Sequence, residues 1–525
     1  MTERPAEPSK ESDDPTGGPL DAGVSSDDPS DPLLGLQTSE GPQVEEGVIR
    51  SGRLAGKTMW AAIGILAIPV LLQQTLTAFV GLVDKMLSGS LPEAIVIPAM
   101  DGVGIGSFVG WFVSIALGGL GLGGQALIAR AMGRGDNEES QRSLGTTLGL
   151  GLGWSILVGV AMWFLVEPLA KATELTPEAA KYAVDYVRVM ALAMPFSGVM
   201  MVGSMCLFGA GETMKPSVIA ALVNVVNLIA SWLLSGVELR VMGTVLDNPS
   251  GIDPLSWGVM GIAGGTAFSW AFGAFATLWV LFRGVKDLRL RMASLMPDPG
   301  IAWRVIRVGF PSFLEGLSMW AVSIFVLTFI GEIADRAAAA DPTLVRGGLV
   351  GAHIITVQWE AFSFLPGFAM GTAAGALAGQ YLGAGNPRMA RRAMGACTIV
   401  GVVIMSLMGV AYMTLGPSLT RIISDNPVHL AETPPLLFIC GTVQAFFALS
   451  MVIRQGLRGV GDTRWTLFIT TASSYGIRLP ACWYLGVHLE LGLPGIWMGL
   501  MGEIVIRGGF FLARYLHGGW AKVRV

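Results

Sequence analysis

The chain has 525 residues, of which 52% are hydrophobic and 14% are charged, and its mean hydropathy is +0.60. This composition is too apolar for a soluble protein and indicates a chain that crosses a membrane several times. The formal net charge of −4 is unevenly distributed along the chain. Twelve acidic residues lie in the first 46 positions, and the remainder of the chain is basic. Neither charge nor motif suggests a nucleic-acid partner.

Residues 1 to about 50 are rich in Pro, Ser, Asp, Glu and Gly. Such a segment buries too little apolar surface to offset the entropy lost on ordering its backbone. We therefore expect an acidic, disordered cytoplasmic tail. It lacks the basic start and short apolar core of a signal peptide, so the first apolar segment is expected to direct insertion.

Twelve apolar segments follow, each long enough to cross a hydrocarbon core of about 30 Å. Without alternating polarity, segments of this length are typical of helices and not of barrel strands. The expected spans are 59–87, 104–129, 144–166, 182–208, 217–236, 256–282, 304–331, 349–380, 393–415, 433–453, 465–486 and 494–516.

Lysine and arginine are unevenly distributed between the two sets of loops. One set carries groups such as Arg130, Arg134 and Arg142, or Arg454, Arg458 and Arg464, whereas the opposite set carries few basic residues. Because basic loops remain in the cytoplasm, both termini are expected there.

The stretch from Gly119 to Gly145 occurs a second time from Ala369 to Gly395, at an offset of 250 residues. The offset also relates Gly209–Thr213 (GAGET) to Gly459–Thr463 (GVGDT). Internal similarity at a fixed offset indicates a duplicated unit. With six spans per unit, both copies enter the membrane from the same side, as parallel repeats.

The expected fold is thus an all-α membrane protein with twelve transmembrane helices in two six-helix lobes, related by a pseudo-twofold axis along the membrane normal. We expect a tail at 1–50, lobes at 51–282 and 304–525, and a cytoplasmic linker at 283–303. Two such lobes can enclose a central cavity and expose it to either side by rocking, as secondary transporters do. A duplicated membrane scaffold or receptor is the plainer alternative, but it gives no reason for polar residues within the spans.

Several short motifs resemble the multidrug and toxic compound extrusion (MATE) family. They are Pro69 with Asp84, the loops at 133–136 and 383–386, the GAGET and RGVGDT sequences, and Arg478-Leu-Pro480. The resemblance covers about residues 59 to 515. It implies a fold of two six-helix lobes around a central cleft, and export of small organic cations or xenobiotics.

Three carboxylates within the spans are candidates for ion coupling. An ionised carboxylate at the bilayer centre costs about 2.5–3.5 kcal/mol on insertion scales, so Asp84, Glu315 and Glu360 require an explanation. The resemblance implies a coupling role for Asp84, whose alternative is to pair with Lys85 at the water interface. Glu315 follows Pro311 by four residues, as Gln73 follows Pro69.

Polar and aromatic residues of other spans are candidates for substrate binding. For the glutamines and glutamates, hydrogen bonding between helices is the alternative role. Arg478 lies within a span and requires a buried acceptor or a watery cavity. The substrate-binding candidates are Gln73, Asn224, Asn227, Gln358, Arg478 and Trp320.

Two departures from the family pattern bear on the coupling ion. Ser231 stands where some members carry an acidic residue, and no carboxylate lies between Glu432 and Asp462. Both departures weaken a sodium assignment and favour proton coupling. Apart from H⁺ or Na⁺, no cofactor and no metal are expected.

The other function classes have little support. No HExxH, Ser/His/Asp arrangement or nucleotide-binding motif is visible, so neither an enzyme nor a primary pump is expected. A flippase of lipid-linked saccharide or polysaccharide precursors, with the same two-lobe plan, remains the alternative. The four cysteines are expected to be buried and unpaired. We expect a monomer in contact with membrane lipids in the cell (inner) membrane.

Overall fold

A computed structural model describes residues 49, 53–92, 95–172, 176–241, 244–340 and 347–525. Within these ranges, the side chains of residues 77–86, 104–109, 239–241, 244–245 and several single positions lie outside the description. The predicted acidic tail also lies outside the described residues.

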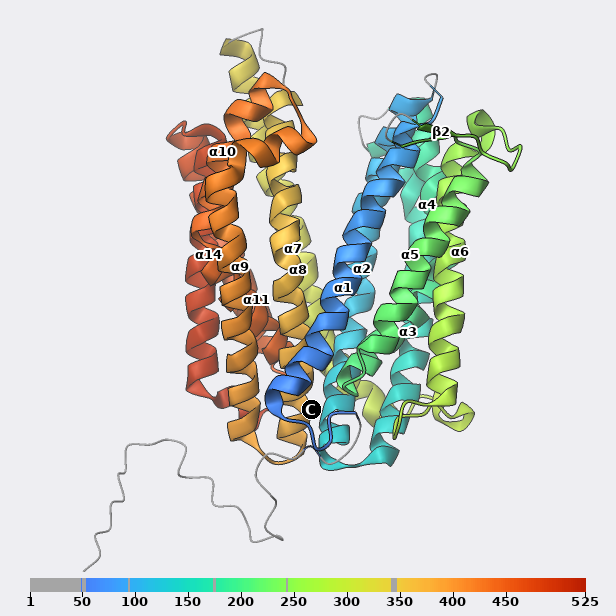
Figure 1. Cartoon of the computed structure of the whole chain (residues 1–525), viewed down its shortest axis with the longest axis vertical. Helices are drawn as coiled ribbons and strands as arrows, with labels where there is room; N and C mark the ends of the chain where they lie inside the picture. Colours follow the sequence, from blue (N-terminus) through green and yellow to red (C-terminus); the bar gives the residue numbers. More distant parts are fainter. Residues whose placement is uncertain (1–48, 50–52, 93–94, 173–175, 242–243, 341–346) are drawn as a thin grey trace, which may run out of the picture. The chain divides into compact units, whose positions relative to one another are not determined.

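The first half of the chain contains six long helices and one short hairpin (Figure 1). The hairpin joins α5 to α6 and pairs Leu239 with Leu246 in an antiparallel register. The elements are α1 (Met59–Gly89), α2 (Val96–Arg134), α3 (Asn137–Ala172), α4 (Pro177–Gly209), α5 (Met214–Ser235), β1 (Leu239–Val241), β2 (Thr244–Leu246) and α6 (Pro254–Arg283).

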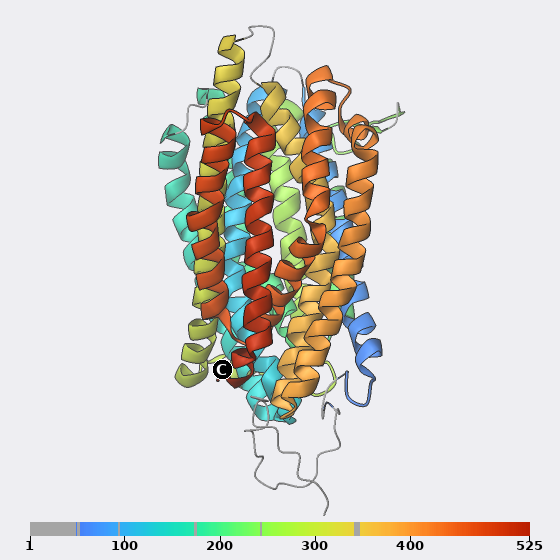
Figure 2. The same cartoon turned by 90° about the vertical axis from the view of Figure 1, so that its left-hand side faces the viewer.

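The second half begins after the 3₁₀ turn η1 (Met292–Leu295) and is also helical (Figure 2). Its helix α7 starts before the predicted span 304–331 and continues beyond it to Ala340. The elements are α7 (Pro299–Ala340), α8 (Gly347–Gly383), α9 (Pro387–Ile423), α10 (Pro427–Thr442), α11 (Gln444–Gly459), α12 (Thr463–Ser473), η2 (Ser474–Arg478), α13 (Leu479–Cys482), η3 (Trp483–His488), α14 (Gly492–His517) and η4 (Gly519–Lys522).

These helices account for the twelve predicted spans. Among the described residues, ten helices are long and apolar enough to cross a membrane, and the bent pair α10 and α11 forms an eleventh. Residues 463–488, in which α and π turns follow one another, form the twelfth helical run. The tenth span was predicted as one continuous segment, 433–453. The structure instead has two helices, α10 and α11, with a bend of 58° between them.

The duplicated loops adopt the same conformation in both halves. Gly135 and Gly385 have φ of 77° and 79°, a left-handed conformation that glycine adopts without steric cost. The next residue caps the following helix, since Asp136 accepts a hydrogen bond from the amide of Glu139 and Asn386 from that of Met389. Glycine ends one helix and the Asp or Asn side chain begins the next.

Close helix contacts confirm that the two halves pack alike. In the first half Gly209 lies against the backbone of Gln125, and in the second Gly459 lies against that of Gly375. Gly159 against Ala191 corresponds in the same way to Gly409 against Gly441. All four residue pairs keep the offset of 250, so each half forms the same bundle.

A reciprocal contact between α2 and α8 relates the two bundles. Gly133 of α2 lies against the carbonyl of Gln380, and Gly383 of α8 lies against the carbonyl of Arg130. The two glycines are 250 positions apart in the sequence, and so are Arg130 and Gln380, which supply the two carbonyls. Such an exchange of partners is what a twofold axis between α2 and α8 produces.

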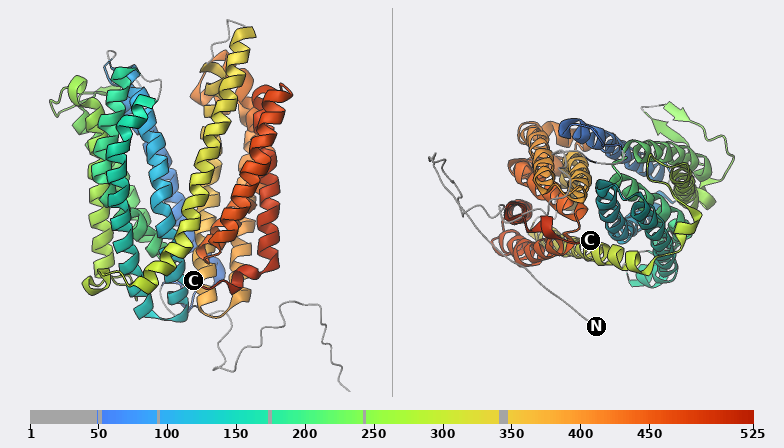
Figure 3. Two further views of the ribbon diagram at one scale, coloured as in Figure 1. Left: turned by 180° about the vertical axis from the view of Figure 1, so that it is seen from behind. Right: turned by 90° about the horizontal axis from the view of Figure 1, so that it is seen from below.

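Two helices extend across the boundary between the bundles. Ala62, Ile63 and Leu66 of α1 share an apolar core with α8 and α9, whereas Val305 and Val308 of α7 pack with α2. Viewed along the helices, α1 in blue and the start of α7 in yellow-green run between the two groups (Figure 3). This crossing follows the same twofold relation.

The two bundles are further joined where α2 and α8 end and α3 and α9 begin, which we term the basic end. Arg130 donates hydrogen bonds to the carbonyls of Val460 (3.0 Å) and Val523 (2.9 Å). Arg304 pairs with Glu139 at 2.7 Å and donates to the main-chain oxygen of Val525. The C-terminal residues therefore contact both halves of the molecule.

Candidate functional site

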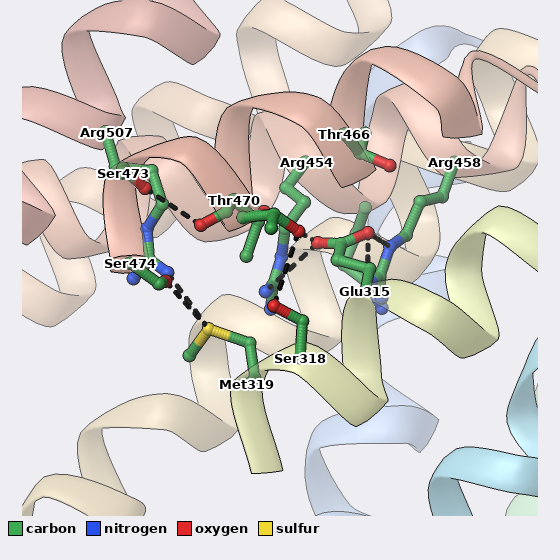
Figure 4. Close-up of polar contacts among 12 residues, drawn as sticks. Glu315, Ser318, Met319, Arg454, Arg458, Thr466, Thr470, Ser473, Ser474 and Arg507 are labelled. Carbon is green, nitrogen blue, oxygen red and sulfur yellow. Dashed lines mark hydrogen bonds and ion pairs between the residues drawn. The ribbon is translucent and has the colours of Figure 1, made fainter. Parts of the chain in front are cut away.

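Six charged residues from four helical elements form a buried group within the second bundle, which we term the arginine–glutamate cluster. Figure 4 labels four of them, Glu315, Arg454, Arg458 and Arg507. Each carboxylate is approached by two guanidinium groups. The members are Glu315 of α7, Arg454 and Arg458 of α11, Arg478 of η2, and Glu503 and Arg507 of α14.

Glu315 is fully buried and held from two sides. Its Oε2 accepts hydrogen bonds from Arg458, with N···O distances of 2.7 and 3.0 Å. Its Oε1 accepts a hydrogen bond from the Thr470 hydroxyl at 2.8 Å and lies 3.6 Å from the Nη1 of Arg454. Such charge-assisted bonds offset the cost of removing a carboxylate from water.

Glu503 provides the buried acceptor that Arg478 requires. Its Oε2 accepts two hydrogen bonds from Arg478, at 2.7 and 3.1 Å. The Nε of Arg507, one helical turn further along α14, lies 3.4 Å from Oε1. Arg507 also donates to the sulfur of Met319 at 3.7 Å.

The local backbone around Arg478 explains how its side chain reaches Glu503. Residues Ser474–Arg478 form a π-helical turn, and Pro480 follows at the start of α13. A π turn inserts an extra residue, and proline removes an amide donor, so both disturb the regular helical ladder. This disturbance places Arg478 against α14.

Glu360 and Gln358 of α8 are half-buried and stand apart from these bonds. Within the described part of the chain, neither side chain makes a hydrogen bond or ion pair. Arg478 and Arg507 nevertheless act on Glu360 electrostatically. Glu360 is thus an acidic neighbour of the arginine–glutamate cluster that has no direct partner among the described residues.

The candidate residues of the first bundle lie on α1 and α5. Gln73 accepts a hydrogen bond from the Ser217 hydroxyl at 3.1 Å, which joins these two helices. Asn227 is buried and donates to Thr266 at 2.9 Å, whereas Asn224 is half-buried. The Asp84 side chain lies outside the described residues.

Trp320 of α7 is partly buried, with its ring centroid 5.9 Å from that of Phe112. The structure thus brings together Glu315, Arg478 and, electrostatically, Glu360. The contacts described for Gln73 and Asn227 lie within the first bundle, to Ser217 and Thr266.

A model of the MatE family matches residues 69–233 and 311–484, which is more than half of the chain and includes both bundles. The chain belongs to the MATE family of transporters. It is therefore a transporter and not an enzyme.

This MATE transporter has similar relatives over most of its length. It is 27% identical over 464 residues to the probable multidrug resistance protein NorM of Thermotoga maritima, covering 87% of this chain and 92% of the relative. It is 25% identical over 452 residues to the multidrug resistance protein PmpM of Pseudomonas aeruginosa, covering 83% and 87%. A crystal structure of MATE in the straight conformation has the same fold, with a TM-score of 0.77, 20% identity and coverage of 90% and 98%.

Sequence reasoning missed four of the six members of the arginine–glutamate cluster in this MATE transporter, namely Arg454, Arg458, Glu503 and Arg507. Arg454 and Arg458 were assigned to a basic loop, but α11 continues to Gly459 and carries both against Glu315. Arg507 lies near the end of the last apolar segment, and the structure buries it beside Glu503. The spacing of four between Glu503 and Arg507 within an apolar helix was the available signal.

Other polar groups lie outside this site. At the basic end, burial raises the pKa of the Asp462 carboxyl, while the hydrogen bond and charge of Arg514 act in the opposite direction. Among the described residues, no group of three or more His, Cys, Asp or Glu side chains could hold a metal ion. All four cysteines are buried and unpaired, as predicted.

Proposed function

We propose that this MATE transporter exports small drugs, organic cations among them, across the cell (inner) membrane by alternating access. Inward proton flow is the proposed driving force, in preference to sodium. The observation that carries the proposal is the similarity over more than four-fifths of the chain to two proteins named for multidrug resistance. Equivalent bundles joined at one end support a rocking motion of one against the other.

The orientation follows from charge. Arginine is concentrated at the basic end, which we place in the cytoplasm together with both termini. The contacts of Arg130 and Arg304 with the C-terminal residues would then close the cytoplasmic side. An inward-facing state requires these hydrogen bonds to break.

Proton coupling is assigned to Asp84, Glu315 and Glu360. The structure describes the side chains of Glu315 and Glu360. Glu360 has no direct partner among the described residues, so gaining or losing a proton there breaks no observed bond. Two N···O contacts join Arg458 to Glu315. Glu315 can therefore take up a proton only if Arg458 moves away and these contacts are lost. Ser231, which hydrogen-bonds to the Ile262 carbonyl, supplies no charge for a sodium ion.

Purified protein in liposomes tests this function. Ethidium should move across the bilayer when a pH gradient is imposed, and an uncoupler should stop the movement. A sodium gradient alone should have little effect. Movement driven by sodium alone would reassign the ion, whereas flipping of a fluorescent lipid without ethidium movement would favour the flippase.

Asp84→Asn is expected to reduce proton-driven ethidium transport at least tenfold, because asparagine keeps the size of the side chain but cannot release a proton. Ethidium binding and thermal stability should remain close to wild type. Asp425→Asn, at an exposed position between α9 and α10, is the matched control. Unchanged transport by Asp84→Asn would remove Asp84 from the coupling mechanism.

A further inference from the structure

A pocket with a volume of about 470 Å³ lies between α3 and α4 of the first bundle. It is close to the end of α3, and thus remote from the basic end, where α3 begins. None of its residues belongs to the arginine–glutamate cluster. Its lining combines charged side chains with aromatic and apolar ones, namely Trp163, Phe164, Glu167, Pro168 and Lys171 of α3 and Arg188 of α4.

Glu167 holds the two basic side chains of the pocket together. Its Oε1 lies 3.1 Å from the Nζ of Lys171, and its Oε2 lies 3.0 Å from the Nη2 of Arg188. The guanidinium of Arg188 also lies over the ring of Trp163, with its Cζ 5.4 Å from the ring centroid. Because two cations share one carboxylate, the lining of the pocket has one positive charge in excess.

Both cations keep N–H groups that a ligand can use. An ammonium has three N–H donors and a guanidinium has five. The hydrogen bonds described for Lys171 and Arg188 involve one nitrogen atom of each. The Glu167 side chain is 49% exposed, and ion pairs at exposed positions contribute little to stability. An anion can therefore enter the pocket without a large loss of protein–protein interaction.

Apolar side chains beside the pocket point away from the protein. Phe164 and Leu165 of α3 are 70% and 63% exposed. Leu192, one helical turn along α4 from Arg188, is 68% exposed. In a membrane transporter such side chains contact lipid chains, and tryptophan beside a basic residue is typical of the level at which lipid head groups begin. The pocket thus borders both parts of a lipid molecule.

The duplicated fold does not by itself require this pocket. The close helix contacts that share the offset of 250 residues align α3 and α4 with α9 and α10. At this offset the second bundle lacks the tryptophan, the carboxylate and the guanidinium, and has Met413, Pro417 and Phe438 in their places. The charged and aromatic set is therefore particular to the first bundle, which indicates a role that the common architecture does not explain.

We infer that this pocket binds the head group of a phospholipid with one net negative charge, whose acyl chains lie along the exposed apolar faces of α3 and α4. The phosphodiester accepts hydrogen bonds from Arg188 and Lys171, because guanidinium and ammonium groups both bind phosphate oxygens. Basic pockets between membrane helices bind anionic head groups in this way. One phosphodiester matches the single excess charge, whereas a choline or ethanolamine head group adds a positive charge of its own.

Native mass spectrometry of the delipidated full-length protein in detergent tests the site, because it counts the lipids that bind during a titration. The probes are dioleoyl phosphatidylglycerol, phosphatidylcholine and phosphatidylethanolamine, which share the same chains. The first phosphatidylglycerol should bind at least fivefold more tightly than either of the other lipids. Equal affinities would overturn the inference. Tighter binding of phosphatidylethanolamine would assign the pocket to an ammonium group and would also overturn it.

The double variant Lys171→Gln with Arg188→Gln should abolish the preference. Phosphatidylglycerol should bind at least fivefold more weakly, and phosphatidylcholine should change less than twofold. Arg421→Gln is the matched control, because Arg421 is exposed and occupies the position of the second bundle that is equivalent to Lys171. A preference that persists in the folded double variant would place the lipid elsewhere and overturn the assignment.

A single variant keeps the test valid if the double variant does not fold. The Lys171 side chain is 75% exposed, so Lys171→Gln should fold as wild type does, which thermal unfolding checks. This variant should lower the preference for phosphatidylglycerol at least twofold. An unchanged preference would contradict the proposed contact between Lys171 and the phosphodiester.

A head-group arm separates a lipid from a soluble phosphate. Glycerophosphoglycerol, which is the same head group without acyl chains, should leave the bound phosphatidylglycerol in place when added in tenfold excess. Displacement by this compound or by inorganic phosphate would assign the pocket to a soluble phosphate and overturn the lipid assignment. Because these measurements use no drug and no gradient, their outcome is independent of the proposed export function.

Discussion

Glu315→Gln is expected to lower the stability of the folded transporter by about 3–5 kcal/mol, the usual cost of removing one partner of a buried ion pair. Glutamine fills a similar volume but leaves Arg454 and Arg458 facing each other without a shared counter-charge. Transport should be lost as well, because α7 and α11 meet through this carboxylate. Thermal unfolding of the detergent-purified protein measures the first effect, and liposome transport the second.

A double variant separates charge from packing in that experiment. Glu315→Gln combined with Arg458→Gln removes both members of the closest pair and should recover a large part of the lost stability, but not transport. Glu490→Gln, in the exposed turn before α14, is the matched control. A melting temperature for Glu315→Gln equal to that of wild type would show that the ion pair contributes little to the fold.

Gly133→Ala is the second change with a large expected effect. A methyl group there would meet the carbonyl of Gln380, which belongs to the backbone of α8 and cannot rotate away. The two helices must separate at the twofold axis, and overpacking of this kind costs about 1–3 kcal/mol. We expect at least a tenfold loss of transport, measured with ethidium in liposomes.

The duplication supplies a second test and a control for this contact. Gly383→Ala should have a similar effect, since Gly383 faces the carbonyl of Arg130 in the equivalent position. Gly153→Ala, within α3 but with open space around it, should be neutral or stabilising by about 0.5–1 kcal/mol. Equal behaviour of all three variants would exclude a special role for the contact between α2 and α8.

The architecture could be predicted from sequence because two simple signals determine it. Long apolar segments specify membrane helices, and the offset of 250 residues specifies two equivalent bundles. The bend between α10 and α11 was missed, because hydropathy alone does not report a change of direction. Gly409 and Gly441 allow α9 and α10 to approach closely just before that bend, but only the structure shows the pairing.

The candidate site could be predicted only in part. Glu315 and Arg478 were found because a charged residue within an apolar span is conspicuous. Arg454 and Arg458 were missed because arginine near the end of an apolar run is the usual marker of a loop. Their partners lie far away in sequence, since Arg458 and Glu315 are 143 positions apart. Such pairing depends on how the helices pack, which a single sequence does not encode locally.

The hydrogen bond between Arg130 and Val523 spans 393 positions and has a consequence for biosynthesis. At about 5–20 residues per second, the ribosome delivers Val523 roughly 20–80 s after Arg130. The first bundle must therefore enter the bilayer and wait without its C-terminal partner. A nascent chain released before its last few residues would carry both bundles but lack this hydrogen bond between them.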